Sequence, residues 1–197
     1  MAEIQGVEAL TRSHDYLREV ATAVPEGAWA APTPCSAWTA RQVLNHARID
    51  QRAFGLVLTG GRPDSDPFQP ADALAGDPVA ELDKVLASVA DGYAQLPAEA
   101  DQVPTPLGPL PLAFAAAAAA MDAAVHAWDI AVATGQNRPL PDDLAEGIRP
   151  AADRLVNHLR DAYQVFAPAE PLREGYGSAE ALLAFLGRDP RWTPPAA

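Results

Sequence analysis

Side chains that can bind a metal recur at helical spacing in the segment MDAAVHAWDIAVATGQ, residues 121–136. Asp122 and His126 are four residues apart, and Asp129 is three further along. Residues spaced by three or four lie on one side of an α-helix, so the three side chains would project together. One helix can contribute two ligands to an ion if a neighbouring helix contributes a third, and His46 lies on another predicted helix. His46, Asp122 and His126 are therefore the candidate ligands of one metal ion.

The chemistry expected of this site is activation of a nucleophile. Two imidazoles and one carboxylate are a common ligand set for zinc and other divalent first-row ions, with water in the remaining position. Such an open position lowers the pKa of bound water or holds a bound thiol as thiolate. Asp50, one turn after His46, is a candidate auxiliary base or, alternatively, a solvated carboxylate. Asp129 is expected to accept a hydrogen bond from an imidazole or a loop amide rather than to bind the metal.

The alternative interpretation of these residues is structural, because an inward histidine is often a hydrogen-bonded core residue. His14 falls on the apolar side of the first predicted helix and is expected to be such a residue. His158 has no ligand-type residue at matching spacing, so we expect a packing or surface role. Cys35 lies in a proline-rich turn without a basic neighbour in sequence, which favours a structural thiol over a nucleophile. As the only cysteine, it can form no intrachain disulfide and no thiolate cluster.

The elements that must position these side chains are helices. Apolar residues at intervals of three and four predict amphipathic helices over residues 4–21, 39–58, 78–96, 112–134, 142–166 and 178–187. Thr39 and Gln42 fit a capping box, Asp77 before a proline fits an N-cap, and Asp142 is expected to cap the fifth helix. Loops rich in proline and glycine separate the helices.

The fold class that follows is an all-α antiparallel four-helix bundle with additional C-terminal helices. We expect one domain over residues 1–197, with the bundle core at about 3–136 and the C-terminal helices at 142–187. A short extended piece is expected over residues 103–110. The alanines that precede Asp122 have small side chains, which permit close contact between helices.

Charge and hydropathy limit the classes of binding partner that the sequence predicts. The formal net charge is -12 and the sequence pI is about 4.6, so phosphate backbones and anionic membrane surfaces would be repelled. We therefore expect no nucleic acid and no membrane as partners. The first ten residues lack the pattern of a signal peptide, and no uninterrupted apolar run reaches the roughly 20 residues of a membrane span. A cytoplasmic location is the expectation.

Three segments carry a family resemblance: PTPCSAWTARQVLNHA (32–47), PLGPLPLAFAAAAAAMDAAVHAWDIAVATGQ (106–136) and LLAFLGRDPRW (182–192). In combination they resemble the actinobacterial metal-binding family related to mycothiol-dependent maleylpyruvate isomerase, within the DinB-like superfamily. The shared pattern is a TPC-x-x-W turn, an NH pair on the next helix, an HxWD helix and a terminal LLGRDPxW. The resemblance implies a DinB-like four-helix bundle.

The resemblance also implies a function. Its metal ligands fall on His46, Asp122 and His126, whereas Asp129 matches an aspartate that does not bind the metal. The expected ion is zinc, with nickel, iron and manganese suited nearly as well. The expected activity is that of a transferase or isomerase in which a metal-activated thiol, with mycothiol as co-substrate, attacks a small electrophile. Maleylpyruvate isomerisation itself is not expected, because the isomerase has a further C-terminal domain.

Two other functions stay open at this point. A non-catalytic metal-binding or ligand-binding protein of the same fold would fill the open metal position with a bulky side chain such as Trp128 or Phe114. A hydrolase would use metal-bound hydroxide with Asp50 as base. Trp29, Trp38 and the GRDPRW tail are a candidate surface for a homodimer.

One departure from the family pattern generates a prediction, because position 122 is Asp where the pattern usually has Glu. The missing methylene shortens the reach by about 1.5 Å, and the neighbouring alanines would let the helices sit closer to compensate. In a competition titration with zinc, Asp122→Glu should therefore change the affinity by about tenfold or more. Equal affinities of the two proteins would contradict a site fitted to aspartate.

Overall fold

The computed structural model describes residues 6–97 and 100–195, and in this part of the chain it contains helices and no strand. The elements are α1 (Val7–Thr22), the short 3-10 helix η1 (Ala28–Ala30), α2 (Ala40–Leu58), α3 (Pro78–Ala94), α4 (Leu112–Ala133), α5 (Asp142–Tyr163) and α6 (Ser178–Phe185). The predicted all-α class is confirmed. Residues 4 and 5 of the first predicted helix lie outside the described residues. The extended piece is present as a single bridge between Val103 and Leu110.

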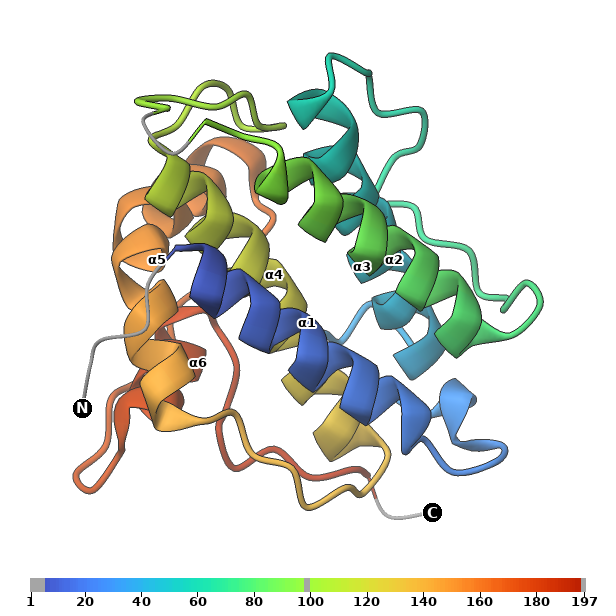
Figure 1. The fold of residues 1–197 in the computed structure, drawn as a ribbon. Coiled ribbons are helices and arrows are strands. Elements are labelled where there is room, and N and C mark those ends of the chain that lie inside the picture. Colours follow the sequence, from blue (N-terminus) through green and yellow to red (C-terminus); the bar gives the residue numbers. More distant parts are fainter. Residues whose placement is uncertain (1–5, 98–99, 196–197) are drawn as a thin grey trace.

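Helix α4 is the centre of the molecule and packs against α1, α2 and α5 (Figure 1). Its alanines provide the close contact, and the fully buried ones are Ala115, Ala116, Ala119, Ala120, Ala123, Ala124, Ala127 and Ala131. A methyl group on each position lets the neighbouring backbones approach without leaving voids. The core therefore combines a thin central helix with larger side chains from its neighbours, such as Leu17, Leu44 and Ile148.

The long connection between α2 and α3 sets the directions of the helices. Positions 55 and 58 of α2 face positions 89 and 92 of α3, so these two helices run parallel. Gly6 lies beside Ala113 at the start of α4, and Gln136 bonds the Val20 carbonyl at the other end, so α1 and α4 also run parallel. Helices α2 and α4 run antiparallel to each other. This arrangement places the middle of α2 against the middle of α4.

The predicted helix starts were confirmed at two helices and wrong at a third. Gln42 and Thr39 form the capping box of α2, and Asp77 accepts hydrogen bonds from two backbone amides at the start of α3. Asp142 is instead the first residue of α5, and its carboxylate accepts from the Ala179 amide in the first turn of α6 at 2.8 Å. The carboxylate thus serves a neighbouring helix, which a local sequence pattern does not reveal.

Helices α5 and α6 complete the structure, with α5 packed on α4 and α6 on α5. Helix α4 is the one helix of the described residues that is long and apolar enough to cross a membrane. In its most apolar window 89% of the residues are buried inside the protein, so this surface is already used in packing. That the whole of residues 1–197 is a single domain stays a prediction.

The packing of α4 predicts the effect of a larger side chain there. Ala119→Leu should lower the free energy of unfolding by about 1–3 kcal/mol, because the added atoms overfill a fully buried site. Urea denaturation measures the change. Ala87→Leu, at an exposed position of α3, is the matched control and should change stability little. Equal stability of the Ala119→Leu variant and the parent would show that α4 is not closely packed.

Candidate metal centre

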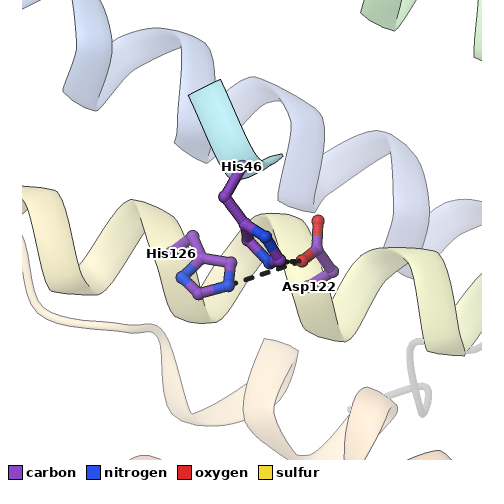
Figure 2. Close-up of side chains that lie close together, drawn as sticks. All are labelled: His46, Asp122 and His126. Carbon is purple, nitrogen blue, oxygen red and sulfur yellow. Dashed lines mark ion pairs between the residues drawn. The ribbon is translucent and has the colours of Figure 1, made fainter. Parts of the chain in front are cut away.

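His46 from α2 and Asp122 and His126 from α4 lie together in the interior (Figure 2). One ligand atom from each residue lies within 4.8 Å of the others. The Asp122 Oδ1 atom is 3.5 Å from His46 Nε2 and 3.5 Å from His126 Nε2. Ligands bound at about 2.0–2.1 Å in a tetrahedron are about 3.4 Å apart. The two distances from Asp122 therefore suit a small divalent ion, and the ligand atoms of the two histidines lie within 4.8 Å of each other.

The Nδ1 atom of each imidazole has an oxygen partner. His46 Nδ1 lies 2.8 Å from the Pro67 carbonyl, and His126 Nδ1 lies 3.0 Å from Asp129 Oδ2. A carbonyl or carboxylate oxygen only accepts, so both Nδ1 atoms must donate. Both Nε2 atoms are then directed at the same Asp122 oxygen. This is the arrangement that orients metal-binding histidines, and it confirms the predicted role of Asp129.

The partner of His46 comes from the loop between α2 and α3, which side chains of α2 and of its N-cap residue hold in place. Asn45 donates to the carbonyls of Ala71 and Ala73 at 2.8 and 2.9 Å. Thr39 donates to Asp72 at 2.9 Å. These contacts fix the loop next to α2 and so keep the Pro67 carbonyl within reach of His46.

The partner of His126 is held by the C-terminal segment. Arg188 donates to both oxygens of the fully buried Asp129, at 3.1 and 3.5 Å. Gly187 precedes it with a φ of 80°, and a Cβ there would lie 2.7 Å from the Ala167 carbonyl. Only glycine adopts this positive φ readily and also has no Cβ to collide with the carbonyl. The turn at Gly187 therefore directs Arg188 inward to Asp129.

The Oδ2 atom of Asp122 is held by hydrogen bonds that begin at His14 and pass through Gln51. The Gln51 Nε2 atom donates to Asp122 Oδ2 and to the Ala119 carbonyl, both at 2.9 Å. The Gln51 oxygen accepts from His14 Nε2 at 2.9 Å. Gln51 is fully buried, so its amide has no water to replace these partners. The chain from His14 leaves Asp122 Oδ1 free to face the two imidazoles.

Burial and neighbouring charges act on the ionisation of the site. Burial lowers the pKa of His126, which favours the neutral ring. Burial acts the same way on His46, but its hydrogen bond with Asp122 and the charges of Asp122 and Asp50 outweigh burial and raise its pKa. Burial, and then the Asp122 charge, raise the pKa of Asp50. Burial opposes ionisation of Asp129, yet the charge of Arg188 keeps its pKa below the usual value.

A cavity of about 800 Å³ opens beside the three residues. Its walls come from α2 with the turn before it and the loop after it, from α4 with the loop before it, from the end of α5 and from the segments before and after α6. Asp50 lines it, with Oδ2 3.9 Å from His46 Nε2. Trp38 also lines it, with its ring 4.6 Å from that of His46. The candidate site therefore lines a cavity that is large enough for a small molecule.

The other chemically interesting residues take structural positions. His14 is buried and bonds Gln51, and His158 is exposed beside Tyr163. Cys35 lines the cavity, and burial raises the pKa of its thiol to about 11, which disfavours the reactive thiolate. These three interpretations agree with those from the sequence.

Two residues of the site were missed by sequence reasoning, namely Gln51 and Arg188. Gln51 lies one turn beyond Ala47 on the inward face of α2, so a polar residue in an apolar stripe was the available signal. Arg188 stands in the GRDPRW tail of the family pattern, but spacing could not pair it with Asp129, which lies 59 residues earlier in the chain.

A model of the family described as the mycothiol maleylpyruvate isomerase N-terminal domain matches residues 10–131, which is more than half of the chain. The chain belongs to this family. The match includes α1 to α4 up to Ala131, and so all three candidate ligands, but it ends before α5 and Arg188.

Individual proteins are similar to this chain beyond the residues that the family model matches. An uncharacterised protein of Mycobacterium tuberculosis, from strains CDC 1551 and H37Rv, is 30% identical over 182 residues, which cover 91% of this chain and 96% of that protein. Crystal structures of mycothiol-dependent maleylpyruvate isomerase and of a mutant of it superpose with a TM-score of 0.53 at 12% identity. The superposition covers 71% of this chain and 64% of the isomerase. This likeness confirms the DinB-like fold, and the chain spans less than two thirds of the isomerase.

The buried pair of Asp129 and Arg188 predicts a large loss of stability when it is broken. Asp129→Ala leaves the guanidinium buried without its partner, so the free energy of unfolding should fall by about 3–5 kcal/mol. Asp153→Ala, which breaks an exposed pair with Arg149, is the control and should cost less than about 1 kcal/mol. Chemical denaturation compares the two, and equal small losses would contradict a structural role for the buried pair.

Proposed function

We propose that this protein is a divalent-metal-dependent enzyme that joins a low-molecular-weight thiol of the mycothiol class to a small electrophile, as a transferase or isomerase. The observation that carries the proposal is the pair of oriented imidazoles. His46 and His126 each have Nδ1 bonded to an oxygen and Nε2 directed at Asp122 Oδ1. Both Nε2 atoms thus meet at one carboxylate oxygen, as the ligands of a single ion would.

The donor set fits a metal ion. His46, His126 and Asp122 would hold it through two nitrogens and one oxygen, a set that zinc favours and that nickel, iron and manganese accept. When bound, such an ion would supply the positive charge that keeps a thiol ionised at neutral pH. The protein itself orients the ligands, through Asp129, the Pro67 carbonyl and Gln51.

The open cavity favours an enzyme over a non-catalytic binding protein of the same fold. A binding protein was expected to fill the space beside the triad with Trp128 or Phe114. Among the described residues, neither lines the cavity that contains His46 and His126. Trp128 is buried in the core instead, and Phe114 lies under Arg154. A volume of about 800 Å³ is within the range of small-molecule sites.

Hydrolysis is a second candidate, favoured by the place of Asp50. Its carboxylate faces the cavity one turn from His46, where it would accept a proton from a water molecule near the triad. The thiol reaction ranks first because the family to which the chain belongs is named for a mycothiol-dependent isomerase.

The metal is tested by elemental analysis of the purified protein. We expect near-stoichiometric zinc or another first-row metal in the parent and none in a His46→Ala, His126→Ala double variant. His158→Ala removes an exposed histidine and is the matched control that should keep its metal. Absence of metal from the parent, with failure of reconstitution, would contradict the proposal.

The reaction is tested with mycothiol and 1-chloro-2,4-dinitrobenzene, whose conjugate absorbs in the near ultraviolet. Metal-loaded protein should accelerate conjugation, chelation should abolish the acceleration, and added zinc should restore it. Asp50→Asn separates the two candidates, because thiol transfer should persist and ester hydrolysis should be lost. Acceleration that survives chelation would show that the triad does not act through a metal.

A further inference from the structure

A second cavity lies between α2, α3 and the connection that joins them. Its volume is about 540 Å³, and it shares no lining residue with the cavity beside the metal centre. Such a volume is within the range of small-molecule sites. We propose that this second cavity binds a small carboxylate with an apolar body, independently of the reaction proposed at the metal centre.

Arg48 of α2 supplies the positive charge that such a ligand requires. Its guanidinium has no carboxylate partner in the described part of the chain, and Nη1 donates to the Asn45 Oδ1 atom at 3.2 Å. The Nε atom has no hydrogen-bond partner, and it is the only buried side-chain nitrogen of the described residues without one. A buried donor without an acceptor is costly, so an acceptor on a ligand would remove a cost that the free protein carries.

The edge of the guanidinium that faces no protein acceptor suits a carboxylate. Nε and Nη2 lie on this edge, and their N–H bonds are parallel. The two oxygens of a carboxylate accept from such an edge together, which gives both hydrogen bonds the help of opposite charge. A neutral amide of the same shape offers one oxygen and one N–H group, so it satisfies only half of the edge.

The other charged side chains of the lining are paired with each other. Arg52 Nη2 lies 2.7 Å from Asp64 Oδ2, and Lys84 Nζ lies 2.6 Å from Glu81 Oε1. The lining thus has three cations and two carboxylates, and Arg48 provides one positive charge in excess. Exposed charges elsewhere in the chain are screened beyond about 10 Å in 0.1 M salt. One unpaired cation matches a monoanion such as a carboxylate better than a dianion such as a phosphate monoester.

The large apolar side chains of the lining suit the body of the ligand. They are Ile49 and Leu56 from α2 and Val85 and Val89 from α3. Ile49, Leu56 and Val85 are only partly buried, so a ligand would cover apolar surface that is in contact with water in the free protein. Burial of this surface adds affinity to the contact with Arg48.

The proposal is tested with octanoate and octanamide, which have nearly the same shape but differ in charge. Calorimetry on the purified protein should show octanoate binding at least about tenfold more tightly, because only the carboxylate pairs with the guanidinium. In proton-nitrogen NMR, octanoate should shift the Nε–H signal of Arg48 and the backbone amides of Ile49 and Val85. Equal affinities, binding of neither probe, or shifts confined to the metal centre would overturn the proposal.

Arg48→Met removes the guanidinium and keeps an unbranched apolar side chain. It should weaken octanoate binding about tenfold or more and leave octanamide binding unchanged. Arg173→Met is the matched control, because Arg173 is exposed and lines neither cavity, and it should alter neither affinity. Octanoate binding to Arg48→Met as tight as to the parent would overturn the proposal. The comparison of the two probes uses the parent protein, so it tests the proposal even if the variant does not fold.

Treatment with a chelator separates this proposal from the function proposed for the metal centre. Octanoate binding should be the same before and after chelation, because the two cavities have different walls. Loss of octanoate binding on chelation would show that the carboxylate binds the metal instead, and would overturn the second site. Octanoate binding that persists in a protein without thiol transfer would support the second site and leave the reaction refuted.

Discussion

The close approach of α2 to the alanine-rich surface of α4 is the constraint on which the candidate site depends. Asp122 has a short side chain, and it reaches both imidazoles because little side-chain volume separates the two helices. The contact of Gln51 with the Ala119 carbonyl, at 2.9 Å, shows that a side chain of α2 reaches the backbone of α4. A larger residue at that position would separate the ligands as well as the helices. The close packing of α2 on α4 therefore also sets the distances between the candidate ligands.

Hydrogen bonds from three directions then fix the orientation of the ligands. The loop after α2 supplies the partner of His46, the C-terminal segment secures Asp129 beside His126, and α1 reaches Asp122 through Gln51. The Pro67 carbonyl and the Asp129 carboxylate can only accept, and the Gln51 NH2 group can only donate, so each ligand has one favoured orientation. The family match ends at residue 131, and Arg188 therefore adds a contact from outside the matched region. In our account the helices beyond the bundle are part of the site.

Local sequence patterns predicted the features that neighbouring residues determine, such as a helix face or a helix start. Helical spacing gave Asp122 and His126 on one face, and the capping box gave the start of α2. His46 on the neighbouring predicted helix offered the third ligand, and the family resemblance matched the same three residues. Contacts between distant segments were beyond such patterns: Asp142 caps a different helix, Gln51 has its partners on α1 and α4, and Arg188 lies far from Asp129 in sequence. The parallel run of α2 and α3 depends on how the long connection crosses the bundle, which periodicity does not encode.

The most direct test of the central claim is long-range proton-nitrogen NMR of the histidine rings during zinc titration. Our account predicts that His46 and His126 keep protons on Nδ1 and that both Nε2 resonances move to positions typical of metal-bound nitrogen, while His158 does not change. Unchanged Nε2 resonances of both rings at saturating zinc, or coordination through Nδ1, would contradict it.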